Sequence, residues 1–259
     1  MVLVDTHAHL YLPQFSDDIR QVIQNATGNH VVKMLLPNID TGSAGPMLEL
    51  CRRFPDHLHP MIGLHPTSVK ENYREKMAEL KSLLGNAEFK AIGETGMDSY
   101  WDTEFMREQE DSFIAHLGWA KTMDLPVVIH SRQTTDDLIR IISSRREEGI
   151  RGVFHAFSGT VEQAAEITGL GFKLGIGGVV TYKNSGLRPV IESIGMEHLV
   201  LETDSPYLSP VPFRGKRNEC ANVILIAEEI AKIKGIGLEE VALRTSENAA
   251  RLFKLDIPI

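Results

Sequence analysis

The chain has few cysteines, no long apolar run and no excess of positive charge. Its two cysteines, Cys51 and Cys220, lie far apart and outside any CxxC pair, which argues against a disulfide framework and a thiolate metal site. No stretch approaches the ~20 apolar residues of a membrane-spanning helix, and no basic segment precedes the first apolar run. We therefore expect reduced thiols in a soluble, cytoplasmic protein that does not engage membranes.

Charge and length limit the classes further. The 259 residues carry 27 basic and 35 acidic side chains, a formal charge of -8, which argues against broad electrostatic wrapping of nucleic acid. A phosphate-bearing substrate would need a local basic pocket or a bound cation. No Pro/Ser-rich spacer, charge block or low-complexity tract divides the chain, so we expect a single domain over residues 1–259.

Short apolar runs typical of buried parallel strands recur along the chain. They are Val2–Val4, Val31–Leu36, Pro60–Gly63, Ala91–Gly93, Val127–Ile129, Gly152–Phe154, Phe172–Gly175 and Leu199–Leu201. Segments with helical spacing separate them, the last from about Leu238 to Phe253. The alternation predicts a parallel α/β fold, and the lack of a GxGxxG turn after the first run disfavours a doubly wound sheet. We expect a closed (β/α)8 TIM barrel with its chemistry at the C-terminal rim.

Metal-binding residue types follow six of the eight runs. In chain order they are Asp5, His7 and His9, then His65, Glu94, His130, His155, and finally Glu202 and Asp204. A barrel would bring them to one rim, and mixed imidazole and carboxylate ligands suit Zn²⁺, Mn²⁺ or Mg²⁺. Because more than four ligands are present, the pattern indicates two divalent cations, with Glu94 as the carboxylate able to bridge them.

Position relative to the strands separates these residues from the other histidines. His57 and His59 repeat the spacing of His7 and His9 but precede the third run, which places them at the opposite rim. His30 and His198 also precede runs, and His116 lies within a helical segment. We expect none of these histidines to bind a metal.

Six segments together resemble the TatD family of metal-dependent deoxyribonucleases, in the family's order. They are Asp5-Thr6-His7-Ala8-His9-Leu10, Gly63-Leu64-His65-Pro66, Ala91-Ile92-Gly93-Glu94, Ile129-His130-Ser131-Arg132, His155-Ala156-Phe157-Ser158-Gly159 and Glu202-Thr203-Asp204-Ser205-Pro206-Tyr207. The segment 248–253 resembles the family's C-terminal signature. The resemblance implies an amidohydrolase-type TIM barrel, a mono- or dinuclear metal centre and 3′→5′ exonucleolytic hydrolysis of DNA.

The resemblance also implies a division of the ligands. His7, His9, Glu94 and Asp204 would hold one metal, and Glu94, His130 and His155 the second. Two departures touch no ligand: Met97 stands where leucine is usual, and Cys220 where proline is usual.

Asp204 is our candidate base, because a carboxylate beside a metal-activated water can take its proton. Glu94 completes the expected catalytic pair. Candidate substrate contacts are His65, Arg132, Tyr207, Arg214, Lys216 and Arg217. Arginine offers a planar fork for phosphate oxygens, and the rings of Tyr207 and Trp101 could stack on bases. For His65 and Arg132 the alternative is structural hydrogen bonding, and for the run 214–217 it is a solvated loop. For Tyr207 and Trp101 it is burial under the rim.

The expected substrate is single-stranded or frayed DNA, because a rim pocket must admit a strand end. Two other functions stay open at this point. The same metal cradle could hydrolyse a lactone, an amide or a phosphotriester, since fold and metals do not fix a substrate. A non-catalytic metal- or nucleic-acid-binding scaffold is the other alternative. We expect a monomer with no obligate protein partner.

Overall fold

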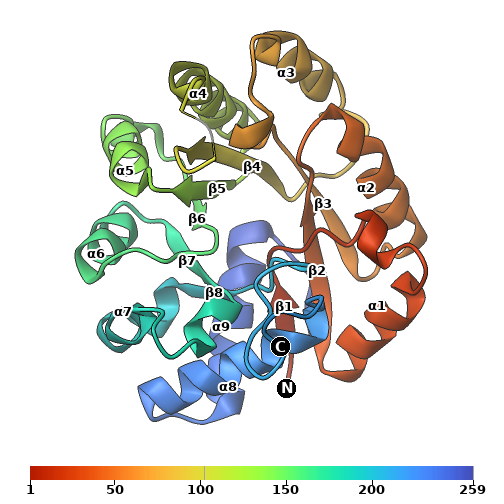
Figure 1. Cartoon of the computed structure of the whole chain (residues 1–259), viewed down its shortest axis with the longest axis vertical. Coiled ribbons are helices and arrows are strands. Elements are labelled where there is room, and N and C mark those ends of the chain that lie inside the picture. Colours follow the sequence, from red (N-terminus) through yellow and green to blue (C-terminus); the bar gives the residue numbers. More distant parts are fainter. Residues whose placement is uncertain (102, 259) are drawn as a thin grey trace.

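The computed structural model describes residues 1–101 and 103–258, and in these residues eight parallel strands form one sheet in sequence order. Figure 1 shows the strands surrounded by helices, which confirms the expected (β/α)8 barrel. The strands are β1 (Leu3–Asp5), β2 (Val31–Pro37), β3 (Leu58–Ile62), β4 (Ala91–Asp98), β5 (Val127–Arg132), β6 (Gly152–Phe154), β7 (Lys173–Ile176) and β8 (Leu199–Leu201). Each pairs with the next in parallel register.

An α-helix follows each of the eight strands, and a further helix, α9, follows α8. The α-helices are α1 (Ile19–Gly28), α2 (Thr41–Arg53), α3 (Tyr73–Ser82), α4 (Met106–Met123), α5 (Thr135–Ser143), α6 (Val161–Gly169), α7 (Leu187–Ser193), α8 (Val223–Lys234) and α9 (Leu238–Phe253). The bounds of α9 are those that the apolar spacing predicts. Within the described residues, no helix is both long and apolar enough to cross a membrane.

The barrel closes between β1 and β8 through hydrogen bonds that continue past both strands. Thr6 N donates to Leu201 O at 2.9 Å, and His9 N donates to Ser205 O at 2.7 Å. Asp204 N donates in the opposite direction, to His7 O at 2.9 Å. This closing seam therefore fixes the backbone of His7 and His9, which follow β1, against that of Asp204, which follows β8.

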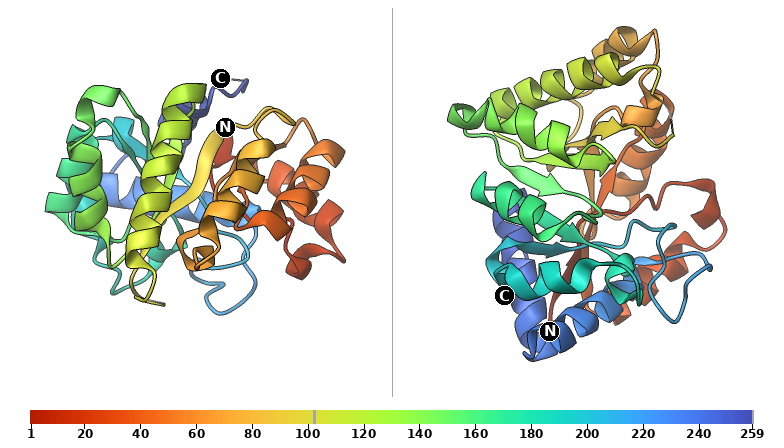
Figure 2. Two further views of the ribbon diagram at one scale, coloured as in Figure 1. Left: turned by 90° about the horizontal axis from the view of Figure 1, so that it is seen from above. Right: turned by 60° about the vertical axis from the view of Figure 1, so that its left-hand side comes forward.

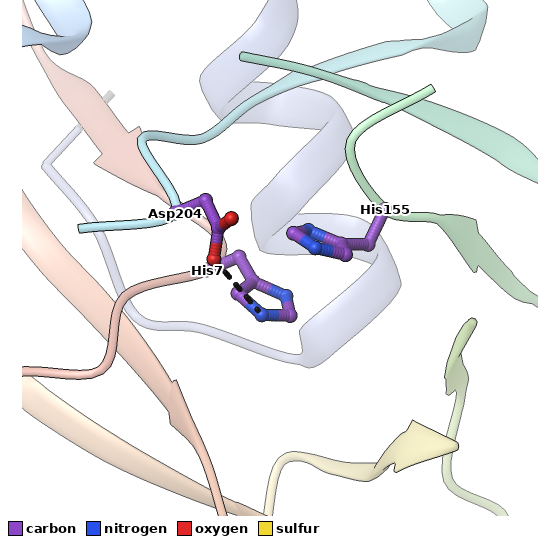
Figure 3. Close-up of side chains that lie close together, drawn as sticks. All are labelled: His7, His155 and Asp204. Atoms are coloured by element: carbon purple, nitrogen blue, oxygen red, sulfur yellow. Dashed lines mark ion pairs between the residues drawn. The ribbon is translucent and has the colours of Figure 1, made fainter. Parts of the chain in front are cut away.

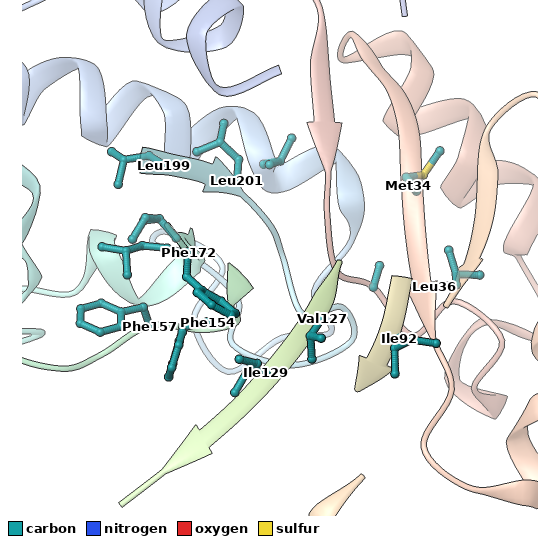
Figure 4. Packing of buried hydrophobic residues seen from close by; sticks show 14 of the residues in the cluster. Met34, Leu36, Ile92, Val127, Ile129, Phe154, Phe157, Phe172, Leu199 and Leu201 are labelled. Carbon is teal, nitrogen blue, oxygen red and sulfur yellow. The ribbon is translucent and has the colours of Figure 1, made fainter. Parts of the chain in front are cut away.

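Apolar side chains form two layers. One lies between the strands and the helices, where Met34, Ile92 and Phe154 point away from the barrel axis (Figure 4). The other lies inside the barrel, where early strand residues such as Val4 and Val128 meet Leu252 and Phe253 of α9. Helix α9 thus closes the N-terminal mouth, and the polar residues are left to the C-terminal mouth. Figure 2 shows the loop after β8 and the segment near residue 100 projecting from the end opposite both termini.

Three strands differ from their predicted extents near the site. Strands β4 and β5 are longer than expected because they pair from Thr95↔Ile129 to Asp98↔Arg132, beyond the apolar run of either. Glu94, His130 and Arg132 accordingly lie within strands rather than after them. Strand β1 ends at Asp5, so the period of two does not place His7 and His9; the closing seam does.

Candidate metal centre

Seven predicted site residues converge at the C-terminal mouth of the barrel. They are His7, His9, His65, Glu94, His130, His155 and Asp204, and three overlapping sets among them have the spacing of metal ligands. In Figure 3 the imidazole of His155 lies over that of His7, with Asp204 beside them; the two ring centroids are 3.5 Å apart. All six predicted ligands therefore lie together, although they are scattered over about two hundred positions.

The first group of candidate ligand atoms lies around His7 Nε2 and His9 Nε2. His7 Nε2 lies 3.3 Å from His9 Nε2 and 3.1 Å from Glu94 Oε2. Asp204 Oδ1 lies 3.9 Å from His7 Nε2 and 3.5 Å from His9 Nε2. A tetrahedron of ligands around a cation at ordinary zinc distances has edges of about 3.4 Å. His7, His9 and Glu94 thus lie close enough together to hold one divalent cation, and Asp204 lies beside the first two.

The second group gathers around the other oxygen of the same carboxylate. Glu94 Oε1 lies 2.8 Å from His130 Nδ1, 3.3 Å from His65 Nε2 and 3.6 Å from His155 Nε2. The two oxygens of Glu94 therefore face two separate sets of imidazole nitrogens. This is the arrangement required of a carboxylate that bridges two cations.

A glycine allows β4 and β5 to approach closely enough for this contact. Gly96 has φ of 140°, a conformation that L side chains rarely adopt, and a Cβ there would lie 2.1 Å from the carbonyl oxygen of His130. Only glycine fits, so the two strands can pass with Glu94 and His130 side by side. Asp204 also has a positive φ, 57°, which aspartate tolerates better than most residues.

Hydrogen-bond partners determine which ring nitrogen can bind a metal. His130 Nε2 lies 2.9 Å from Asp98 Oδ2, and His155 Nδ1 lies 2.8 Å from Glu202 Oε1. A carboxylate favours a proton on the nitrogen that faces it, so a cation bound beside Glu94 would take the place of the proton on the opposite nitrogen of each ring. His130 and His155 are therefore orientated as metal ligands.

His9 and His65 differ from each other in which ring nitrogen their neighbours occupy. Tyr11 donates its hydroxyl hydrogen to Pro37 O at 2.7 Å, so its oxygen accepts from His9 Nδ1 at 2.9 Å, which leaves His9 Nε2 free to bind a cation. His65 Nδ1 instead accepts from Thr67 N at 3.2 Å, which places the proton of a neutral ring on Nε2. His65 is thus set up as a hydrogen-bond donor in the centre, consistent with its predicted contact to phosphate.

Burial and the neighbouring charges shift the pKa values of the residues in the centre in opposite directions. Burial alone would raise the pKa of Glu94, but the imidazoles of His65, His7 and His155 outweigh it and hold that pKa well below its usual value. Burial would lower the pKa of His155, but Glu202 and Glu94 raise it to about 10. In His7 burial prevails and lowers the pKa. The carboxylate of Glu94 and the imidazole of His155 therefore stabilise each other's charged forms.

Three buried carboxylates outside the predicted set of ligands also face the centre or the segments that carry it. Asp98 and Glu202 orient His130 and His155 as described, and Asp5 accepts hydrogen bonds from the Thr203 amide and hydroxyl at 2.9 and 2.6 Å. Burial raises the pKa of Asp5 to about 7. All three lie at strand ends, where predicted ligands also lie. This position in the sequence could have identified them as residues of the site. What they contact depends on neighbouring strands.

The predicted substrate contacts surround the mouth. Tyr207 is half exposed and lies edge-on to His9, with centroids 6.3 Å apart. The guanidinium of Arg132 lies over the rings of Tyr100 and Trp101. Arg214 stacks on Tyr182 in the same way.

The basic run after β8 is divided between two environments. Arg217 donates two hydrogen bonds to Asp18, at 2.9 and 2.7 Å, and one to Glu219 at 2.8 Å. Its guanidinium also packs over Phe15, whereas Lys216 lies near Phe213 on the exposed loop. The structure therefore uses Arg217 to tie the loop to the segment before α1 and leaves Arg214 and Lys216 at the surface.

A barrel with a cluster of imidazoles and carboxylates at its C-terminal mouth defines a class of metal-dependent enzymes, and comparison with known proteins identifies the family. The family model described as TatD related DNase matches residues 4–254, so the chain belongs to the TatD family. The relative "Uncharacterized metal-dependent hydrolase YabD" of Bacillus subtilis is 36% identical over 256 residues, which cover 98% of this chain and 100% of the relative. YcfH of Escherichia coli, described in the same words, is 34% identical over 260 residues, 99% of this chain and 97% of its own.

Solved structures give the same result. The crystal structure of YjjV, a TatD homologue from Escherichia coli, superposes with a TM-score of 0.92 at 30% identity, and 98% of each chain is covered. A TatD-family hydrolase from Entamoeba histolytica superposes with a TM-score of 0.86 at 25% identity, again over 98% of each chain. The predicted family is confirmed over nearly the whole chain.

Proposed function

We propose that the protein is a metal-dependent 3′→5′ exodeoxyribonuclease that acts on single-stranded or frayed ends. The observation that carries this proposal is Glu94, whose two oxygens face two sets of imidazoles with Asp204 beside one of them. The family's DNase description and the basic and aromatic side chains around the mouth support a nucleic-acid substrate. The proposed catalytic residues are Asp204 and Glu94.

His7, His9, Glu94 and Asp204 would hold one divalent cation, and Glu94, His130 and His155 a second, with Mg²⁺, Mn²⁺ or Zn²⁺ as candidates. Such cations supply positive charge for the phosphoryl oxygens and lower the pKa of the attacking water. The donor set suits this chemistry because it combines imidazoles with carboxylates.

The protein's own side chains supply the remaining steps. The carboxylate of Asp204 orients the attacking water and accepts its proton as the oxygen bonds to phosphorus. His65 Nε2–H, fixed by the Thr67 amide, donates a hydrogen bond to a phosphoryl oxygen as negative charge develops there. The bond from phosphorus to the 3′ oxygen of the preceding nucleotide breaks, that oxygen takes a proton from solvent water to become a hydroxyl, and one mononucleotide leaves.

The test combines metal control with defined substrates. Protein stripped by chelator should not digest a 5′-labelled single-stranded oligonucleotide, and restoring Mg²⁺, Mn²⁺ or Zn²⁺ should give a ladder that shortens from the 3′ end. Blocking the 3′ end should stop digestion. Asp204→Asn tolerates the positive φ and should keep the fold and some metal binding but lose turnover.

A parallel assay with esters, lactones and a phosphotriester addresses the other hydrolases. Cleavage of those compounds without any cleavage of DNA would contradict the proposal. Failure of the metal-loaded protein to hydrolyse any substrate would favour a binding scaffold.

A further inference from the structure

Exposed apolar side chains gather at the mouth of the barrel. Among the described residues, nine large hydrophobic side chains are exposed, and six of them lie in the segments after β4 and β8. These six are Tyr100, Trp101, Tyr207, Leu208, Val211 and Phe213. Apolar surface gathered around a polar centre marks a binding site rather than a packing defect.

One part of this surface has the composition of a stacking site. Trp101 is 67% exposed, and its ring lies edge-on to Tyr100, with centroids 5.0 Å apart. The guanidinium of Arg132 lies 3.9 Å from the centroid of Tyr100 and 5.3 Å from that of Trp101. An exposed indole stacks on any nucleobase, and a neighbouring arginine adds a cation for the attached phosphate.

The same cluster is fixed at a set position beside the metal centre. Asp98 Oδ1 accepts hydrogen bonds from the amides of Tyr100 and Trp101, at 2.9 and 3.0 Å, while its Oδ2 faces His130. Arg132 lies two residues beyond His130 on β5, so the two side chains share one face of the strand, about 7 Å apart along it. One carboxylate therefore links the rings to a predicted metal ligand.

We propose that Tyr100, Trp101 and Arg132 form a subsite that stacks the unpaired 3′-terminal base of the substrate strand; this inference rests on the proposed nuclease function. The terminal base lies against Trp101, and Arg132 faces the phosphate joined to it. A base held in this way cannot remain paired, which gives the enzyme its preference for single-stranded or frayed ends.

The charges around the mouth give the strand its direction. A groove of about 800 Å³ that Arg132 helps to line also has the acidic residues Asp136 and Glu162 in its lining, and acidic residues disfavour a phosphate backbone there. In a ring of eight strands β8 lies opposite β4, and the loop after β8 carries Arg214 and Lys216. The rest of the DNA strand therefore extends from the subsite across the mouth of the barrel and over the loop after β8.

Fluorescence tests the contact without turnover. The chain has two tryptophans, and Trp119 is largely buried, so the exposed signal belongs to Trp101. In chelator-treated protein, a single-stranded oligonucleotide should protect this signal from acrylamide quenching. Trp119→Phe should keep the protection and Trp101→Phe should remove it. Unchanged quenching at saturating oligonucleotide would overturn the subsite.

Kinetics with a modified 3′ end test the assignment of the base. One stacked base corresponds to about a 5- to 150-fold change in affinity. For the wild type, an abasic 3′-terminal nucleotide should raise the KM by that factor. Trp101→Ala should raise the KM for the intact oligonucleotide by a similar factor. In this variant the KM for the abasic oligonucleotide should equal that for the intact one. The matched control is Leu243→Ala, which removes an exposed side chain on α9 and should behave as the wild type.

Two results separate this inference from the proposed function. Hydrolysis with the same abasic penalty in Trp101→Ala as in the wild type overturns the subsite alone. Absence of hydrolysis by metal-loaded wild type overturns the nuclease proposal, and the quenching measurement then still decides whether Trp101 contacts a single strand.

Discussion

The Oδ2 of Asp98 lies 2.9 Å from the Nε2 of His130, so the predicted metal ligand on β5 is orientated by a buried carboxylate on β4. Asp98→Asn would place an amide donor against Nε2 and move the ring proton to Nδ1, the atom that faces Glu94. Loss of such a partner typically lowers metal affinity by about 10- to 100-fold. We expect this loss in competition titrations against a chelating dye.

The control for this variant is Asp137→Asn, which neutralises an exposed carboxylate on α5. Its metal affinity should equal that of the wild type. An unchanged affinity in Asp98→Asn would show that the carboxylate does not set the orientation of His130.

The carboxylate of Glu202 faces His155 Nδ1 as that of Asp98 faces His130 Nε2. Gly175 leaves the space that the Glu202 carboxylate occupies. A Cβ on Gly175 would lie 2.2 Å from Glu202 Oε2, so Gly175→Ala should displace the carboxylate from His155. We expect Glu202→Gln and Gly175→Ala to weaken metal binding by similar factors, about 10- to 100-fold. Gly177→Ala is the control, because its added Cβ meets nothing closer than 3.8 Å. Full affinity in Gly175→Ala would contradict this prediction.

The buried His116 should make stability depend on pH. Its Nε2 accepts from Leu64 N at 3.1 Å, its Nδ1 donates to Ser112 O at 2.7 Å, and burial lowers its pKa from 6.5 to about 4. Above pH 6.5 the ring is neutral in both states. As the pH falls from 6.5 to 4, the unfolded chain binds a proton that the folded protein does not, so the free energy of unfolding decreases by up to about 3 kcal/mol.

Denaturant unfolding between pH 4 and 7 measures this effect. His116→Gln should be less stable at pH 7 but should lose this part of the pH dependence. Leu117→Met alters the same helix without a titratable group and should keep the wild-type slope. An unaltered slope in His116→Gln would disprove the assignment.

Lys216 and Arg217 should differ in their effect on DNA binding. Each phosphate contact to a single strand contributes about -0.7 to the slope of log affinity against log salt. Lys216→Ala should make the slope shallower by about that amount in chelator-treated protein. Arg217→Ala should leave the slope unchanged and lower the Tm, because it breaks the hydrogen bonds to Asp18 and Glu219. The reverse result would assign Arg217 to the substrate.

Removing the metal should destabilise the protein. A cation present at 100 times its dissociation constant stabilises the folded state by about 2.7 kcal/mol. We expect chelator to lower the Tm and added metal to restore it in a concentration-dependent way. In His9→Asn the response should be smaller, since one of the proposed ligands around His7 changes. A Tm that does not respond to metal would argue against binding at this centre.

The strand and helix sequence was predictable because each apolar run and each helical face has a local pattern. The run over 199–201 and the helix over 238–253 have their predicted bounds. The extensions of β4 and β5 were not predictable, because polar residues such as Thr95 and Ser131 enter those strands only through pairing between them. Gly96 permits that pairing.

The sequence by itself determined which residues could bind metal, since imidazoles and carboxylates at successive strand ends must meet if a barrel forms. Tertiary structure decided how each one acts. His65 and His130 are alike in sequence, but the Thr67 amide faces one ring and the Asp98 carboxylate faces the other. Arg217 and Lys216 are neighbours, yet among the residues that the structure describes only Arg217 has carboxylates within reach. Such roles depend on partners contributed by distant segments, and a linear pattern does not specify those partners.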